Sequence, residues 1–327
     1  MNHEQIRAFC IDFNWDSTFR YASPGLYAQA NPAEHLKWYK DLGVNTIQSF
    51  CVSHNGYAWY KSDVAPRIPN MPGSFFSELA EAAKKEDMRV MGYFSPGANE
   101  YWRKTYPDYS HDRLCKTYWH MPFSERFNDY LAAEITDAID KIPMDGFMID
   151  FMWSVDPIWL PVERQMYTEL LGEKFPYNAV PDEAATREFQ IRSVRRAWTR
   201  IRETAKAIDK NTIIWLSSGS VENYQVSETG VGAECDWLMN EHPTISSLDA
   251  AKRITGPNAT IMQCVCGWEG DNSTAAVHDA NAIFEAIGSS DVGIYGFARP
   301  DEVTTLPKVE GDNANARNIR AMRANFR

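Results

Sequence analysis

The sequence is short of basic side chains: 33 Lys and Arg stand against 44 Asp and Glu, which gives the 327 residues a formal net charge of −11. Nucleic acids and anionic membranes attract proteins with a basic face, so this balance argues against both as partners. No run approaches the roughly 20 apolar residues of a membrane span. The first residues also lack the charged and apolar regions of a signal peptide.

Cysteine is scarce and irregularly spaced, which argues against a disulfide framework. Most of the six cysteines lie in apolar, strand-like runs, so we expect reduced core side chains and a cytoplasmic location. Cys264 and Cys266 would share one face of a strand, but no second pair completes a zinc site. Phosphate-binding glycine loops are missing, and the serines at 217–220 lack the spacing of a nucleophile elbow. We therefore expect no metal or other cofactor, and a Ser-His-Asp hydrolase is disfavoured.

Short apolar runs alternate with amphipathic stretches along the whole chain. The runs have the length and composition of buried parallel strands and lie at 6–15, 44–52, 88–95, 147–150, 212–218, 235–240, 259–266 and 292–297. Helical stripes separate most of them, at 32–42, 76–83, 127–142, 194–208, 248–254, 277–283 and 314–325. The link 219–234 shows no helical period, and 154–182 is a long insertion of the kind that usually has a function. This alternation predicts an α/β fold, a (β/α)8 TIM barrel forming a single domain over 1–327.

The most informative run is 144–153, an apolar centre with an aspartate on each side. It is too short for a helix and follows a helical pattern directly, which predicts a buried parallel strand. A carboxylate at the end of such a strand is costly unless it is paired or hydrogen-bonded, and barrel enzymes carry their catalytic groups at that end. Asp150 is therefore the first candidate catalytic residue. The alternative is a carboxylate that only caps the following loop.

In a barrel the strand ends meet at one mouth, so the residues there are expected to form one site. Carboxylates, amides and aromatic rings dominate these positions, as in a site where sugar hydroxyls meet polar groups and the sugar ring meets Trp or Tyr. The candidate substrate-binding residues are Asp12, Trp15, His54, Tyr57, Tyr93, Trp153, His242, Trp268 and Arg299. For His54 a structural role is an equal alternative, and Tyr57 equally fits rim packing.

Cleavage of a glycosidic bond needs two carboxyl groups, one ionised and one protonated. Glu241 follows the sixth strand, across the mouth from Asp150, and its apolar neighbours favour the raised pKa of a general acid. We therefore predict a retaining mechanism with Asp150 as nucleophile and Glu241 as acid/base. A surface carboxylate is the alternative for Glu241, and Glu269 and Glu222 are the substitutes.

Three stretches together resemble a known family: His54-Asn55-Gly56-Tyr57-Ala58-Trp59-Tyr60, 90–95 and 145–150. They resemble barrels classed as hypothetical glycosyl hydrolases, related in pattern to the α-L-fucosidase family, over roughly 6–153. The resemblance implies hydrolysis of an α-linkage, fucosidase- or galactosidase-like, with the nucleophile at the end of the fourth strand. In this chain that role falls on Asp150.

Two other function classes stay open. One is a sugar isomerase or epimerase whose divalent metal is held by Asp150, Glu241, His242 and Asp301. The other is a barrel that binds carbohydrate without catalysis. A carbohydrate is the expected partner in every case, and the oligomeric state is open, with a homo-oligomer among the alternatives.

Overall fold

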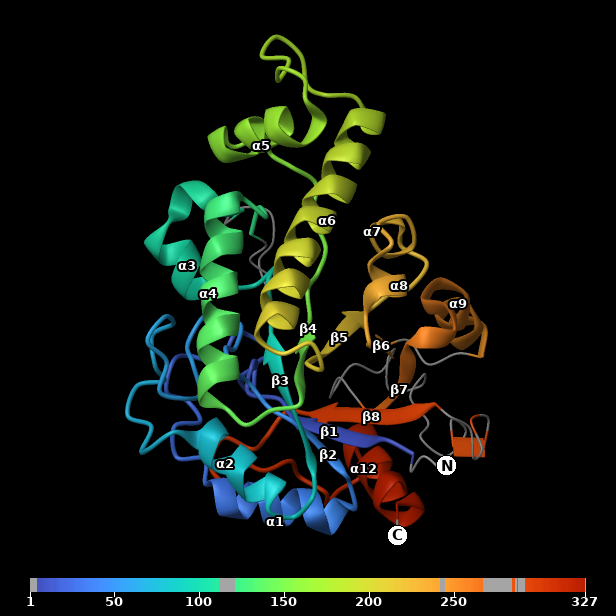
Figure 1. Cartoon of the computed structure of the whole chain (residues 1–327). Helices are drawn as coiled ribbons and strands as arrows, with labels where there is room; N and C mark the ends of the chain where they lie inside the picture. The colour runs from blue at the N-terminus through green and yellow to red at the C-terminus, as the bar shows by residue number, and fades with distance from the viewer. Residues whose placement is uncertain are drawn as a thin grey trace.

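Eight parallel strands close into a barrel in sequence order in the computed structural model, which describes residues 5–111, 121–241, 245–266, 284–285, 287 and 292–326 (Figure 1). They are β1 (Arg7–Ile11), β2 (Thr46–Gln48), β3 (Arg89–Phe94), β4 (Gly146–Ile149), β5 (Ile213–Ser218), β6 (Trp237–Asn240), β7 (Thr260–Cys266) and β8 (Gly293–Ala298). Pairing of β1 with β8 closes the ring. The predicted (β/α)8 barrel is confirmed.

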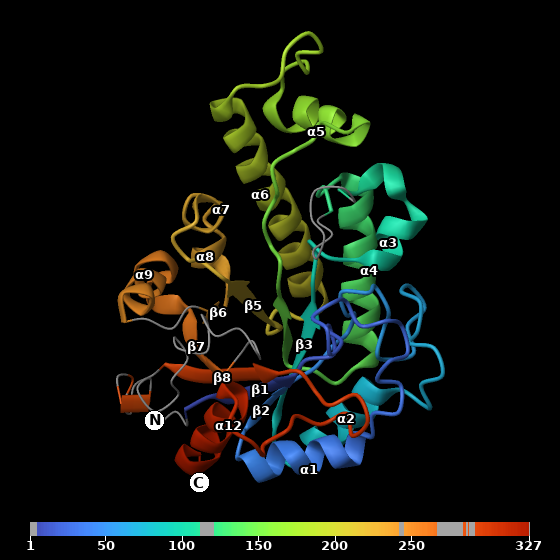
Figure 2. The ribbon, with the colours of Figure 1, turned by 180° about the vertical axis from the view of Figure 1, so that it is seen from behind.

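Helices cover the outside of this barrel, as Figures 1 and 2 show from opposite sides. In the described ranges they are α1 (Pro32–Leu42), α2 (Phe75–Lys84), α3 (Glu100–Thr105), η1 (Pro107–Tyr109), α4 (Glu125–Lys141), α5 (Pro161–Leu171), α6 (Glu183–Ile208), α7 (Tyr224–Ser227), α8 (Val231–Glu234), α9 (Ile245–Thr255), η2 (Gly256–Asn258) and α12 (Ala314–Asn325). Local chemistry sets their ends: at α1 the Asn31 side chain accepts from two backbone amides, and Gly43 ends the helix in the left-handed region with φ 90°.

The structure differs from the sequence prediction mainly at element boundaries. The second strand is three residues long because Val52 turns back to bridge Ala58 in the antiparallel direction. The link 219–234 holds two helices of four residues each, too short to produce a visible period. β4 ends at Ile149, so Asp150 lies one residue beyond the strand, although its N–H still donates to the Phe94 carbonyl of β3 at 2.9 Å.

The insertion after β4 contains helix α5 and continues into α6, whose 26 residues correspond to a length of roughly 39 Å. Figures 1 and 2 show α5 and the first turns of α6 projecting beyond the barrel. We call residues 154–190 the arm. The arm has its own small core, made by Met166, Tyr167, Phe175 and Phe189. The stripe expected from residue 194 onwards belongs instead to the main core, which explains why the sequence showed only the second part of α6.

The cysteines that the structure describes are buried and form no disulfide, as the sequence predicts. Five cysteines are free and buried: Cys10, Cys51, Cys235, Cys264 and Cys266. Cys115 lies outside the described residues, as does the whole of the predicted 277–283 helix. Among the helices of the described ranges, none is long and apolar enough to span a membrane.

Candidate active site

A cavity of about 30 Å³ lies at the carboxyl ends of the strands. This volume fits one or two water molecules. The side chains around it are therefore packed closely together at the bottom of the barrel mouth. Its walls combine carboxylates, aromatic rings and sulfur atoms from six of the eight strands or the loops that follow them: Cys10, Asp12, Asn14, Trp15, Phe50, His54, Tyr93, Met148, Asp150, Phe151, Met239, Glu241, Tyr295 and Phe297.

Asp150 is held in this cavity by neutral donors. Its Oδ2 accepts from the Tyr93 hydroxyl at 2.6 Å and its Oδ1 from the backbone N–H of Phe151 at 2.9 Å. Burial raises the pKa of Asp150, while bonds from Tyr93, Ser217 and the Phe151 amide oppose the rise. Phe151 has φ 51°, in the left-handed region that a bulky residue rarely adopts. Backbone strain next to a buried carboxylate is typical of functional sites.

Tyr93 links Asp150 to the loop after β2. The His54 Nε2 lies 2.8 Å from the Tyr93 hydroxyl oxygen, and the Asn14 side-chain amide donates to the same oxygen at 3.3 Å. Asn14 also accepts from the backbone N–H of His54 at 2.8 Å. The three strand ends β1, β2 and β3 are therefore joined behind Asp150 by one hydrogen-bond network.

Asp12 is a second buried carboxyl group in the same cavity. It is 8% exposed, and its Oδ1 accepts from the Asn14 backbone N–H at 2.9 Å. Burial raises the pKa of Asp12 to about 7, against the opposing bond from Asn14, and the negative charge of Asp150 adds to the rise. Arg299 lowers that pKa through its charge. Asp12 thus titrates near neutral pH, which a sugar-binding role alone does not require.

Glu241 lines the cavity together with Asp150. Its backbone N–H donates to the Ser218 carbonyl at 3.2 Å, which continues the pairing of β6 with β5 by one residue beyond β6. Its Oε2 lies 3.3 Å from where a Cβ on Gly219 would stand, so the glycine leaves room for this carboxylate. The expected pair of carboxyl groups is therefore brought to one cavity.

Three of the residues that we expected to bind substrate contact other parts of the protein instead of lining the cavity. Tyr57 packs against the Tyr101 ring, with centroids 6.0 Å apart. Trp153 stacks on Phe151 with centroids 4.6 Å apart, one residue layer away from the cavity wall. Arg299 donates to the Asp16 carbonyl at 2.7 Å and covers the Phe19 ring.

Of the remaining candidates, Glu222 and Asp301 are described by the structure, and neither is among the residues that line the cavity. Glu222 lies on the surface, 75% exposed, 4.0 Å from Arg253. Asp301 pairs with Lys308 at 2.7 Å and accepts from two loop amides, so it does not join Asp150 in a metal site. Among the described residues no His, Cys, Asp and Glu side chains are grouped as a metal site would need. His242, Trp268 and Glu269 lie outside the described residues.

Sequence reasoning placed Asn14 and Ser217 at the mouth without a specific role, and it did not identify Cys10 and Tyr295 as site residues. Asn14 and Ser217 both stand at strand ends, and both contact the Asp150 network. Cys10 and Tyr295 line the cavity from inside the barrel, where alternation along β1 and β8 puts every second side chain. That alternation is the signal that would have found them.

Comparison with known proteins shows which family model part of this chain matches. Residues 31–151 match the model of a family described as "Hypothetical glycosyl hydrolase 6". No curated protein matches the chain by sequence. The matched segment runs from the start of α1 to the residue after Asp150, so it includes His54, Tyr93 and Asp150.

Solved structures with this fold include several glycoside hydrolases. Alpha-L-fucosidase isoenzyme 2 from Paenibacillus thiaminolyticus is similar with a TM-score of 0.74 at 16% identity, over 98% of this chain and 49% of that one. The PgaB (BpsB) glycoside hydrolase domain from Bordetella bronchiseptica gives 0.62 at 12% identity, over 98% of both chains. Unliganded alpha-L-fucosidase AlfC from Lactobacillus casei gives 0.54 at 12% identity, over 98% of this chain and 94% of that one.

This chain thus spans about half the length of the fucosidase isoenzyme, and identities this low carry the fold rather than the substrate. The resemblance to a hypothetical glycosyl hydrolase family is confirmed over 31–151, and the solved structures share the barrel fold of this chain.

Proposed function

We propose that the protein is a retaining glycoside hydrolase that cleaves an α-linkage, with Asp150 as the nucleophile and Glu241 as the acid/base. The observation that carries the proposal is the placement of both carboxyl groups on one cavity at the carboxyl ends of the strands. Glycosidases need two such groups on either side of the bond that breaks. The preference for an α-linkage comes from the resemblance to fucosidases.

In the first step Asp150 attacks the anomeric carbon while Glu241 protonates the leaving oxygen, which gives a glycosyl-enzyme ester. In the second step Glu241 takes a proton from water, the water attacks the same carbon, and the ester bond to Asp150 breaks. Asp12 and Trp15 border the same cavity, and in this proposal they contact the sugar that is held between the two carboxyl groups.

The first experiment is a screen of aryl α- and β-glycosides with wild-type protein, with and without EDTA, and with Asp150→Asn. We expect release of the aryl alcohol from an α-glycoside, insensitive to EDTA and absent in the variant. Conversion of a free sugar, with no release of aryl alcohol and lost in EDTA, would favour the metal-dependent isomerase or epimerase class. Binding of the sugar by both proteins with no turnover in either would favour a carbohydrate-binding barrel.

The role of Glu241 is tested by leaving-group dependence. Glu241→Gln should slow glycosides of poor leaving groups far more than activated aryl glycosides, because a good leaving group needs little protonation. An equal loss on both substrates would remove Glu241 from the acid/base role.

The stereochemical outcome tests the role of Asp150. Retention goes with carboxyl groups about 5–5.5 Å apart, and about 6.5–9.5 Å goes with inversion. Proton NMR of the first-formed sugar anomer should show retention. An inverted product would make Asp150 a base that activates water.

The cellular location is part of this proposal. The five described cysteines are all free, and free thiols persist in a reducing compartment. We place the protein in the cytoplasm on that ground.

A further inference from the structure

We propose that Tyr93, with His54 behind it, is a positioning residue that fixes the Asp150 carboxylate and keeps it ionised for attack, and that it is not a ligand of the sugar. This inference rests on the proposed function, because it concerns how the nucleophile is held. It changes the role that the sequence predicts for both Tyr93 and His54.

The hydrogen-bonding capacity of the Tyr93 hydroxyl is already used. A phenol has one proton to donate and accepts through its oxygen. The proton goes to Asp150 Oδ2, the shortest of its contacts at 2.6 Å. The oxygen is then approached by His54 Nε2 at 2.8 Å and by the Asn14 amide at 3.3 Å. A sugar hydroxyl would have to displace one of these partners.

This arrangement also assigns the tautomer of His54. Because Tyr93 gives its proton to Asp150, the short contact with His54 is a hydrogen bond only if Nε2 carries a proton and donates. A donor at the phenol oxygen strengthens the bond that the phenol makes to the carboxylate, since chained hydrogen bonds polarise one another. His54 therefore acts on Asp150 through Tyr93.

Packing holds His54 in this role. The side chain is 1% exposed, and three aromatic rings surround it: Phe151 at 4.7 Å and Trp15 at 5.3 Å stand nearly perpendicular to the imidazole, and Tyr21 lies at 5.1 Å. Tyr93 is itself 4% exposed and packs against Phe50. Both rings are fixed before any substrate arrives, as a positioning role requires.

Other titratable groups face Asp150 and must be considered in any pH experiment. They come from every part of the cavity wall: Asp12 and Cys10 on the β1 side, His54 after β2, Glu241 after β6 and Tyr295 on β8. A comparison between variants that leave all of these in place isolates the contribution of Tyr93.

Tyr93→Phe removes one donor to the carboxylate and leaves the ring. Because that donor favours the ionised form, its loss should raise the pKa of Asp150 by about one to two units. The acid limb of kcat/KM should move to higher pH by the same amount, since attack requires ionised Asp150. We expect kcat to fall by about 10- to 100-fold, with little change in KM.

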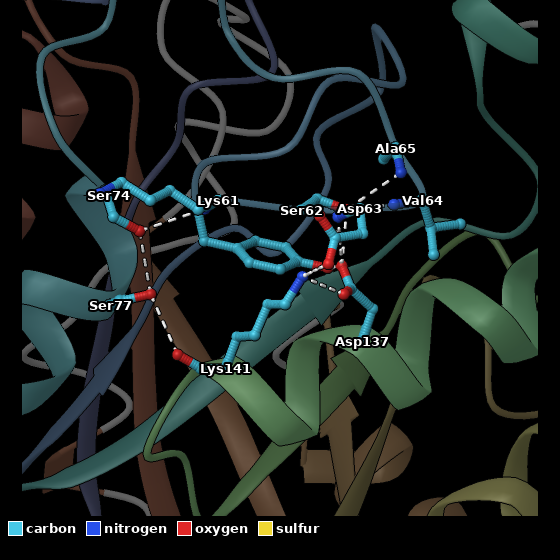
Figure 3. Close-up of polar contacts among 10 residues, drawn as sticks. Lys61, Ser62, Asp63, Val64, Ala65, Ser74, Ser77, Asp137 and Lys141 are labelled. Atoms are coloured by element: carbon cyan, nitrogen blue, oxygen red, sulfur yellow. Dashed lines mark hydrogen bonds and ion pairs between the residues drawn. The ribbon is translucent and has the colours of Figure 1, made fainter.

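Tyr60→Phe is the matched control. Tyr60 is also fully buried and also donates to an aspartate, Asp137 Oδ2 at 2.8 Å, away from the cavity. Figure 3 shows the surroundings of Asp137, with Ser62 and Lys141. This variant loses the same kind of bond, so it should lose stability but keep the acid limb of the wild-type protein.

The pKa is measured directly by NMR titration of protein labelled with 13C at the aspartate carboxyls, with the Asp150 signal assigned from Asp150→Asn. A raised Asp150 pKa in Tyr93→Phe but not in Tyr60→Phe supports the proposal, and an unchanged pKa in folded Tyr93→Phe overturns it. Should Tyr93→Phe fail to fold, His54→Leu takes its place, with a smaller rise expected and no rise counting against the proposal. The titration needs no turnover, so it stands even if the wild-type protein hydrolyses no glycoside and the proposed function fails.

Discussion

Asp150 and Asp137 are both aspartates that accept a hydrogen bond from a buried tyrosine, yet their pKa values shift in opposite directions. Asp150 accepts from Tyr93 at 2.6 Å, and burial raises its pKa. Asp137 accepts from Tyr60 at 2.8 Å; burial again acts upward, but Lys141 above all outweighs it and the net pKa is lowered.

The difference lies in the charge and number of the partners. Asp137 meets the Lys141 ammonium at 2.5 Å and also accepts from the Ser62 hydroxyl and the Asp63 amide (Figure 3). Such an aspartate ties the loop after β2 to α4 and has little capacity left for a new bond. The donors that hold Asp150 are all neutral. The proposed nucleophile is thus oriented by hydrogen bonds from neutral groups.

The largest expected effect separates the two aspartates by activity. Asp150→Asn should reduce kcat by about 10³-fold or more, because the proposed nucleophile is lost from the transition state. Asp137→Asn should stay within about threefold of wild type, since it lies outside the cavity. Both are measured on the glycoside found in the screen, with circular dichroism to verify folding. Equal losses of kcat in the two variants would show that Asp150 and Asp137 do not differ in their importance for activity.

A second prediction extends the comparison to Asp12, whose folded pKa of about 7 exceeds the unfolded value of about 3.9. The folded state then binds more protons between these values, so this group's contribution to stability falls as pH rises from about 4 to 7. Asp12→Asn should therefore raise the free energy of unfolding by about 2–4 kcal/mol at pH 8. Urea unfolding at pH 4 should show a much smaller gain. A gain in stability that is independent of pH would mean that the pKa of Asp12 is not raised in the folded protein.

Asp137 should behave in the opposite way. Asp137→Ala leaves Tyr60, Ser62 and Lys141 without their acceptor, and we expect a loss of about 1–3 kcal/mol at pH 7. Because the folded pKa is lowered, the wild-type contribution is complete above the unfolded pKa and is lost as pH falls through the folded one. Denaturant unfolding of both proteins from pH 7 downwards should show the difference between them shrinking as pH falls below about 4.

The smallest effect comes from the cation alone. Lys141→Met keeps the neutral donors on Asp137, so that aspartate should then resemble Asp150 more closely. We expect its pKa to rise from the lowered value, which the same 13C titration reads. The effect should shrink with added salt, because the Lys141 side chain is 25% exposed. A pKa of Asp137 unchanged in this variant would show that the neutral donors, and not Lys141, lower it.

Much of the fold follows from the sequence because barrel formation depends on periodicity, which the chain carries in each segment. The strand ends that bring Asp12, Asp150 and Glu241 to one cavity follow from topology: all eight strands run parallel, so all their carboxyl ends share one rim. The boundaries of β2 did not follow, since its last residues are as apolar as a strand but turn back towards Ala58.

The network behind Asp150 could not be predicted from the sequence. Tyr93, His54 and Asn14 are far apart in the chain, and their contacts depend on ring orientation at the level of tenths of an ångström. The left-handed backbone of Phe151 gave no signal either, because glycine is the residue that marks such positions. The residue types at the strand ends are enough to predict a site. The direction of each hydrogen bond, the tautomer of His54 and the pKa values of the carboxyl groups require the three-dimensional geometry.

The arm has a consequence for how this barrel can change. Its core of Met166, Tyr167, Phe175 and Phe189 is separate from the core of the barrel, and its tip exposes Tyr177 and Val180 at 76% and 75%. A segment that is stabilised by its own contacts accumulates substitutions and length changes without disturbing the strands. The arm can therefore be redesigned with little effect on the Asp150 network beneath the mouth.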